Sequence, residues 1–256
     1  MSLIQYTTAN HVAEILIHNP PVNALTETLL DDYIAALHKA GQDDDIRAVI
    51  VSSAVSGRFC AGLDLKAIND GQANVPDLLE RLYRQMTDAQ YALNKPSIAA
   101  VNGTARGGGM TMSISCDVII ASEESTFGYP EIDAGVLPSI HFNHLPKIVG
   151  KHRAFELLFS GRTFGPDEAK ELGLVSQVVP ADQVMPAARE LAAVFCGKPR
   201  DIMRLGRQAF KEASDPHYRA AVSSAVDNFC HVAGLPDAQE GFAAFAQKRK
   251  PKWNGA

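Results

Sequence analysis

The sequence lacks the features that mark several large classes of protein. Its 256 residues include four cysteines, at positions 60, 116, 196 and 230, and no two of them form a C-x-x-C motif. This pattern argues against a zinc site and against a disulfide framework, so we expect no bound metal. No apolar run reaches the length of a membrane-spanning helix, and the first residues lack the basic and apolar parts of a signal peptide. We therefore expect a cytoplasmic protein with reduced thiols and no membrane partner.

Positive charge is also scarce in this chain. There are 24 lysines and arginines against 29 acidic residues, which gives a net charge of −5. A chain with this balance has no overall attraction for nucleic acid, so we expect no nucleic-acid partner. Hydrophobic residues make up 46% of the sequence, which is typical of a globular protein with a sizeable core.

Strand patterns alternate with helix patterns over most of the chain. Residues 11–17, 48–52, 98–101, 117–121 and 174–179 read as strands, and residues 26–41, 76–93, 151–160 and 166–173 read as helices. From position 184 onward the pattern is helical, in segments 184–195, 202–213, 217–232 and 237–248. We therefore predict an α/β fold, with a core over residues 1–196 and a helical region over residues 197–256.

Two glycine-containing stretches stand where a strand gives way to a helix. In Val101–Thr111 a strand ends at Asn-Gly and a helix begins after three glycines, and Arg58–Lys66 has a similar form. Glycine lets the backbone approach a ligand closely, and the first helical turn leaves N–H groups free. Two such donors, one from each stretch, would make an oxyanion hole. Each stretch alone is equally consistent with tight packing.

Taken together, these stretches resemble one known family. The motif Phe-Cys-Ala-Gly-x-Asp-Leu-Lys begins at Phe59, and Asn-Gly-x-x-x-Gly-Gly-Gly begins at Asn102. In this order they resemble the crotonase family, also called the enoyl-CoA hydratase/isomerase superfamily, and the resemblance extends from Asn19 to Pro251. It implies a spiral of ββα units with a helical C-terminal region used in trimer formation. A homotrimer, or a hexamer made of two trimers, is the assembly that it implies.

The resemblance also gives roles to residues. It implies that the N–H groups of Leu63 and Gly108 bind the thioester oxygen of an acyl-CoA, and that Glu131, in a Phe-Gly-x-Pro-Glu context, is the catalytic carboxylate. From the residues alone, Glu131 is better read as a surface glutamate after a proline turn, and the resemblance reverses that preference. The family needs no prosthetic group, because coenzyme A arrives as part of the substrate.

Thr111 departs from the family pattern. Members that hydrate a double bond usually carry a first glutamate at this position, and a hydroxyl is not a strong base near neutral pH. We therefore predict double-bond isomerisation of an enoyl-CoA by Glu131 alone. The alternatives are hydration of a 2-enoyl-CoA by Glu131 alone, a non-catalytic acyl-CoA binder, and a serine hydrolase. The hydrolase would use Ser113, Ser115 or Ser139 with a nearby histidine, and no G-x-S-x-G motif supports it.

A second departure follows Glu131. Ser139 stands where other subfamilies place an aspartate, and His141 and His144 follow it. Each histidine is either a second acid/base or acyl-contacting group, or a hydrogen-bonded structural side chain.

Further substrate contacts are predicted around the two loops and at the C-terminus. Lys66, and Lys248 in the Lys-Arg-Lys-Pro segment, are candidates for the phosphates of coenzyme A, with solvated surface charges as the competing interpretation. The full set of predicted substrate contacts is Ala61, Asp64, Lys66, Gly109, Thr111, Ser139, His141, Phe245 and Lys248.

Overall fold

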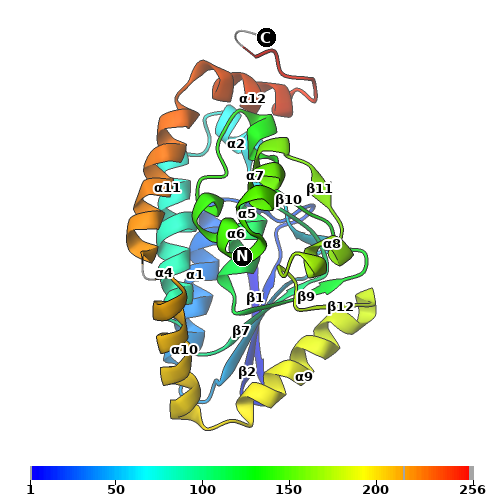
Figure 1. Ribbon diagram of the computed structural model, residues 1–256, viewed down its shortest axis with the longest axis vertical. Coiled ribbons are helices and arrows are strands. Elements are labelled where there is room, and N and C mark those ends of the chain that lie inside the picture. The colour runs from blue at the N-terminus through cyan, green and yellow to red at the C-terminus, as the bar shows by residue number, and fades with distance from the viewer. Residues whose placement is uncertain (1, 216, 254–256) are drawn as a thin grey trace.

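The computed structural model describes residues 2–215 and 217–253, and a six-stranded sheet lies at its centre (Figure 1). The strands lie in the order β1-β2-β4-β7-β9-β12. Only β1 and β2 are antiparallel, and the other neighbours are parallel. The bounds are Ile4–Ala9 (β1), Val12–Ile17 (β2), Ala48–Ser53 (β4), Ser97–Val101 (β7), Val118–Ser122 (β9) and Gln177–Val179 (β12).

Two smaller sheets lie beside the first. One has the order β11-β10-β8-β5, and the other pairs β3 with β6. Successive strands go to different sheets, since β4 is followed by β5, β7 by β8 and β9 by β10. The chain therefore winds as a spiral, which confirms the predicted fold class. The bounds are Ala24–Leu25 (β3), Gly57–Cys60 (β5), Gly62–Leu63 (β6), Gly103–Arg106 (β8), Phe127–Gly128 (β10) and Thr163–Phe164 (β11).

Helices follow the strands of each turn of the spiral. Those up to residue 183 are Glu27–Gln42 (α1), Leu65–Asn69 (α2), Val75–Leu79 (α3), Glu80–Gln85 (η1), Met86–Tyr91 (α4), Gly108–Ser115 (α5), Pro130–Ala134 (η2), His141–Val149 (α6), Lys151–Ser160 (α7), Pro166–Glu171 (α8) and Ala181–Gln183 (η3). The remaining helices are Val184–Cys196 (α9), Arg200–Ser214 (α10), Tyr218–Ala233 (α11) and Pro236–Ala246 (α12).

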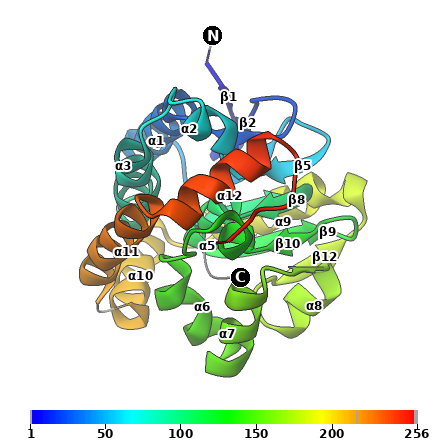
Figure 2. The same ribbon diagram turned by 90° about the horizontal axis from the view of Figure 1, so that it is seen from above.

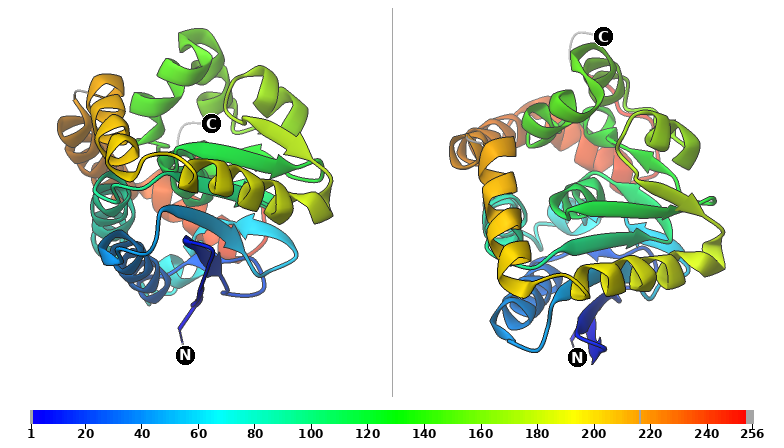
Figure 3. Two further views of the ribbon diagram at one scale, coloured as in Figure 1. Left: turned by 90° about the horizontal axis from the view of Figure 1, so that it is seen from below. Right: turned by 60° about the horizontal axis from the view of Figure 1, so that its bottom comes forward.

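Strand β4 is buried on both faces, as its continuous apolar sequence predicts. Val49 and Val51 belong to the main core, whereas Ala48 and Ile50 pack in a second cluster with Ala188 of α9. This division follows the two-residue period of a strand. Helix α9 therefore covers one face of the main sheet, along which it lies in Figure 3.

The helix predicted over residues 76–93 is wrong in detail. The structure divides it into α3, a π-helical segment η1 and α4, and the first of these begins after Asn74, whose side chain accepts from the Asp77 N–H. The last predicted helix, 237–248, is also too long, because α12 ends at Ala246 and Lys248 has a φ of 53°. A left-handed residue cannot continue an α-helix.

The C-terminal helices pack on their own chain. Helix α11 contacts η1 and α3, and α12 contacts α2 and η2. Figure 1 shows α10 and α11 along one side, and Figure 2 shows α12 crossing above α5. Phe242 of α12 is buried, whereas Phe245 remains 60% exposed. The elements that carry the predicted site are therefore covered by the last helices of the same chain.

Candidate active site

The two glycine-containing loops touch each other. A Cβ atom added at Gly62 would lie 3.2 Å from the amide nitrogen of Gly108, and one added at Gly109 would lie 2.3 Å from the carbonyl oxygen of Cys60. Any larger residue would push the loops apart, so glycine is required for the contact. Leu63 follows Gly62 in β6, where it pairs with Leu25 of β3. The structure thus brings Leu63 and Gly108, the two predicted oxyanion donors, to one place.

A small chamber of about 60 Å³ lies where the loops meet. Glu131 faces it, together with both predicted donors. Phe229 of α11 closes one side. The chamber is lined by Ala61, Gly62, Leu63, Leu65, Leu82, Tyr83, Gly107, Gly108, Pro130, Glu131, Ala134, Val136 and Phe229. Sequence reasoning missed Leu82, Tyr83 and Phe229, because nothing in an amphipathic helix shows which apolar residue meets a ligand.

Glu131 occupies the 3-10 helix η2, directly after Pro130. Its Oε2 atom is buried and has no hydrogen-bond partner among the described residues. Burial raises the pKa of the Glu131 carboxyl to about 7, because the charged form loses its hydration. A carboxyl group with this pKa can both accept and return a proton near neutral pH.

Two tyrosines surround the Glu131 carboxyl. Burial raises the pKa of Tyr83 and of Tyr129, and the negative charge of Glu131 raises both further. Both phenols therefore stay protonated next to the carboxylate. The Tyr129 hydroxyl is buried without a partner in the described part of the chain.

Thr111 and His141 form a hydrogen-bonded pair behind the chamber. The Thr111 Oγ1 atom lies 3.2 Å from Nε2 of His141, whose side chain is fully buried. Burial, and to a smaller extent nearby His144, lower the pKa of His141 to about 3, so the imidazole is neutral. The His141 ring packs against the edge of the Tyr129 ring, with centroids 4.6 Å apart. Neither Thr111 nor His141 lines the chamber itself.

Six other predicted contacts lie outside the chamber lining, namely Asp64, Lys66, Gly109, Ser139, Phe245 and Lys248. Asp64 caps α2, since its Oδ1 atom accepts from the Ala67 N–H at 3.0 Å. Lys66 is exposed and forms a 2.6 Å ion pair with Asp70. Ser139 is buried, and its hydroxyl donates to the Leu137 carbonyl at 3.4 Å.

Ser113, Ser115 and Ser139, the candidate nucleophiles of a hydrolase, all donate hydrogen bonds to backbone carbonyls. The Ser113 hydroxyl donates to Met110 at 3.1 Å, and the Ser115 hydroxyl donates to Met112 at 2.7 Å. A serine nucleophile needs a histidine within hydrogen-bond reach, and none of the three candidates has one among the hydrogen bonds of residues 2–215 and 217–253. The serine hydrolase alternative is therefore without support.

The predicted C-terminal contacts lie near α2. Lys248 is exposed two residues beyond α12, and α12 packs on α2, which carries Lys66. Arg249 is held by Glu240 in an ion pair of 2.6 Å. Lys66 thus lies on α2, and Lys248 lies just beyond the end of α12, the helix that contacts α2.

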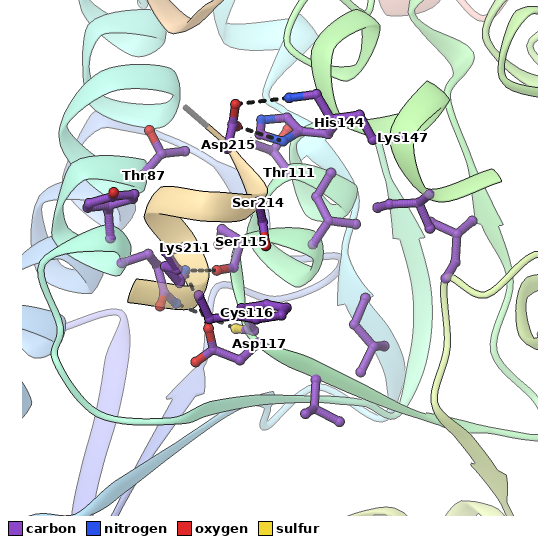
Figure 4. Close-up of a pocket in the computed structure, with 18 of the residues that line it drawn as sticks. Thr87, Thr111, Ser115, Cys116, Asp117, His144, Lys147, Lys211, Ser214 and Asp215 are labelled. Atoms are coloured by element: carbon purple, nitrogen blue, oxygen red, sulfur yellow. Dashed lines mark hydrogen bonds and ion pairs between the residues drawn. The ribbon is translucent and has the colours of Figure 1, made fainter. Parts of the chain in front are cut away.

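A larger cavity of about 590 Å³ lies further along α5 and contains several charged side chains (Figure 4). In one group Lys211 lies 3.4 Å from Asp117, and in the other Lys147 lies 2.9 Å from Asp215. Asp117 also pairs with Arg207 at 2.8 Å.

Within the described residues, no three His, Cys, Asp or Glu side chains are grouped as metal ligands. No described helix combines the length and apolarity needed to cross a membrane.

Comparison with known proteins gives one consistent result. The family model described as enoyl-CoA hydratase/isomerase matches residues 7–256. The chain belongs to the enoyl-CoA hydratase/isomerase family. It is 32% identical to a probable enoyl-CoA hydratase of Bacillus subtilis over 259 residues, covering 100% of both chains. It is 34% identical to the 2,3-dehydroadipyl-CoA hydratase of Escherichia coli over 236 residues, covering 91% of each.

A solved structure of a family member supports the same fold. The enoyl-CoA hydratase/isomerase of Pseudoalteromonas atlantica superposes with a TM-score of 0.88 at 26% identity, covering 98% of this chain and 100% of that one. The family predicted from the two glycine motifs is thereby confirmed. The roles of single residues in that site stay predictions.

Proposed function

We propose that this protein is an enoyl-CoA isomerase that uses one carboxylate, Glu131. The observation that carries the proposal is the position of this carboxyl group, with a pKa of about 7, beside the meeting point of the Leu63 and Gly108 loops. The amides of Leu63 and Gly108 bind the thioester oxygen. Each donor contributes about 3 kcal/mol to stabilising the enolate-like transition state.

The reaction moves a double bond by one proton transfer in each direction. The Glu131 carboxylate removes a proton from C2 of a 3-enoyl-CoA, the C2–H electron pair forms a C1=C2 bond, and the carbonyl π electrons move onto the thioester oxygen held by the two amides. The carbonyl then re-forms, the C1=C2 electrons become the C2=C3 bond, and the electrons of the old C3=C4 bond take the proton from Glu131 at C4, which returns Glu131 to its ionised form. A single group that both accepts and donates a proton is sufficient for this sequence.

Thr111 and His141 support the one-carboxylate mechanism. The Thr111 hydroxyl is hydrogen-bonded to a neutral, buried imidazole, and neither side chain lines the chamber. Glu131 is the one carboxylate among the described chamber-lining residues.

Hydration of a 2-enoyl-CoA is the second candidate. The Bacillus subtilis and Escherichia coli relatives are both named as hydratases, which favours it. In this reaction Glu131 would remove a proton from water as the oxygen attacks C3, and would give that proton to C2. The oxyanion hole would serve both reactions in the same way. A non-catalytic acyl-CoA binder is disfavoured, because a binder gains nothing from a buried carboxyl group.

The rest of the proposal concerns binding and assembly. Lys66 and Lys248 hold the phosphates of coenzyme A, and no prosthetic group takes part. Exposed apolar side chains on α7 and α10, such as Phe155 and Phe210, support a homotrimer or a hexamer. The protein acts in the cytoplasm, in fatty acid metabolism.

The deciding experiment incubates the protein with 3-hexenoyl-CoA and, separately, with crotonyl-CoA. Conjugation of the first and hydration of the second are followed by absorbance. Glu131→Gln should reduce kcat about 100-fold to 10,000-fold, whereas Glu124→Gln, at an exposed glutamate close in sequence, should retain activity. Conjugation without hydration supports the isomerase, and hydration that requires Glu131 supports the hydratase. Full activity of Glu131→Gln would refute both.

A further inference from the structure

The chamber and the larger cavity are lined by the same run of elements. Three segments line the chamber with earlier residues and the cavity with later ones. Examples are Leu82 and Thr87 in η1–α4, Gly108 and Thr111 in α5, and Val136 and Ile140 in η2–α6. Because each of the three segments passes from the chamber lining to the cavity lining within three to five residues, the two spaces are neighbours. Thr111 is three residues from Gly108, a rise of about 4.5 Å along the helix.

Thr111 and His141 lie between these two spaces. Thr111 contributes to the cavity wall but not to the chamber lining, and His141 contributes to neither. His141 is fully buried, its Nε2 atom lies 3.2 Å from the Thr111 hydroxyl, and its ring centroid lies 4.6 Å from that of the Tyr129 ring. Two separate contacts therefore fix the imidazole in place. An aromatic side chain held in this way cannot move aside without losing both contacts.

We propose that Thr111 and His141 form a partition that closes the acyl end of the Glu131 chamber and restricts the enzyme to short acyl groups. The inference rests on the proposed function, since it takes the chamber as the site of the reacting carbons. The larger cavity, of about 590 Å³, lies on the other side of this partition from the chamber, which measures about 60 Å³.

The size of the chamber sets the expected limit. The chamber is much smaller than the cavity, so a short acyl group is the one expected to stay within it. A crotonyl group, with three carbons beyond the thioester carbonyl, fits this space. An eight- or ten-carbon chain has to pass the partition, and forcing it past a packed imidazole costs binding.

The test measures kcat/KM for crotonyl-CoA, 2-hexenoyl-CoA and 2-decenoyl-CoA, together with the corresponding 3-enoyl thioesters. For the wild-type protein, kcat/KM should be about 10-fold or more higher for the shortest substrate that it converts than for the ten-carbon substrate. His141→Ala removes most of the imidazole and should raise the ratio of long-chain to short-chain kcat/KM by about 10-fold or more. A milder variant, His141→Asn, should shift the ratio in the same direction by less.

His144→Ala is the matched control. His144 lies one helical turn further along α6 and lines the cavity rather than the partition. Its replacement should leave the chain-length ratio unchanged. A wild-type protein that turns over ten-carbon substrates as efficiently as short ones would overturn the proposal, even if neither His141 variant folds. A His141→Ala protein that loses activity equally at every chain length would also overturn it.

Binding separates this proposal from the proposed reaction. If no enoyl-CoA is turned over, calorimetric titration with butyryl-CoA and decanoyl-CoA still tests the partition. Weak binding of decanoyl-CoA that His141→Ala strengthens would support the partition while the proposed reaction fails. Equal binding of both acyl-CoAs by the wild-type protein would reject the partition alone.

Discussion

The Oε1 atom of Glu131 lies 3.2 Å from the point where a Cβ atom would stand on Gly107. Gly107 immediately precedes α5, and its φ of 49° lies in the left-handed region. The carboxyl group therefore packs directly against the backbone of the loop that delivers the Gly108 amide. Gly107 therefore contacts the carboxyl group proposed to transfer the proton, and it directly precedes the residue whose amide is proposed to bind the oxyanion.

Gly107→Ala should impair catalysis strongly. The added methyl group displaces Glu131 and also strains a left-handed backbone, so we expect kcat to fall about 100-fold. Gly150→Ala is the matched control, because Gly150 has a φ of 82° and open space around its Cβ position. It carries the same type of strain without a contact to Glu131. Equal losses of kcat in the two variants would show that strain alone is responsible.

The activity should depend on pH through Glu131. Burial raises the pKa of this carboxyl to about 7, and only its ionised form accepts the C2 proton. We therefore expect kcat/KM to rise about 10-fold for each pH unit below 7 and to level off above it. The pH profile of kcat/KM with a 3-enoyl-CoA measures this directly. A flat profile between pH 5 and 8 would contradict the assignment.

The same group should lower the stability of the fold at alkaline pH. A carboxyl whose pKa is raised in the folded state binds a proton more tightly there than in the unfolded chain. The contribution of the Glu131 carboxyl to the free energy of unfolding is therefore fully present below pH 4.5. It decreases by about 3 kcal/mol as the pH rises to about 7. Glu131→Gln removes the ionisation. Urea denaturation should find this variant more stable than the wild-type protein at pH 8.5, with a smaller difference at pH 5.

Two glycine-to-alanine substitutions should change the stability of the fold in opposite directions. One lies at the contact between the two loops and the other lies on helix α10, where there is open space. Gly109→Ala places a Cβ atom 2.3 Å from the Cys60 carbonyl oxygen, so we expect a loss of about 3 kcal/mol or more. Gly206 in α10 has open space, and Gly206→Ala should stabilise the protein by about 0.5–1 kcal/mol. Thermal denaturation compares the two. A Gly109→Ala protein as stable as the wild type would argue against the close packing of the loops.

The sequence predicted those parts of the fold that are marked by local signals. Helix α7 spans Lys151–Ser160 as predicted, because Gly161 stops it with a φ of 64°. Strand β1 was missed, since its turn uses Asn10 and His11 in left-handed conformations in place of the usual Asn-Gly. The π-helical segment η1 was missed because no residue pattern marks it.

The sequence predicts the parts of the candidate site that lie in recognisable motifs. It does not predict the parts that depend on how distant segments pack together. The contact between Gly109 and Cys60 explains why the glycine motifs occur together, and Glu131 faces the same chamber. The place of Phe229 depends on how α11 packs on η1, a contact between segments far apart in sequence. His141 was recognised as a candidate, but its neutral state follows from complete burial, which neighbouring residues in sequence do not reveal.

The position of Phe229 bears on how the protein matures during synthesis. One wall of the chamber comes from α11, and α12 packs beside it on α2 and η2. The strands, both loops and Glu131 leave the ribosome well before these helices. A nascent chain can thus build its spiral before the Phe229 wall of the chamber is in place, because that wall forms only when α11 docks. Catalytic competence is therefore expected to arrive as a final step, after the core has already folded.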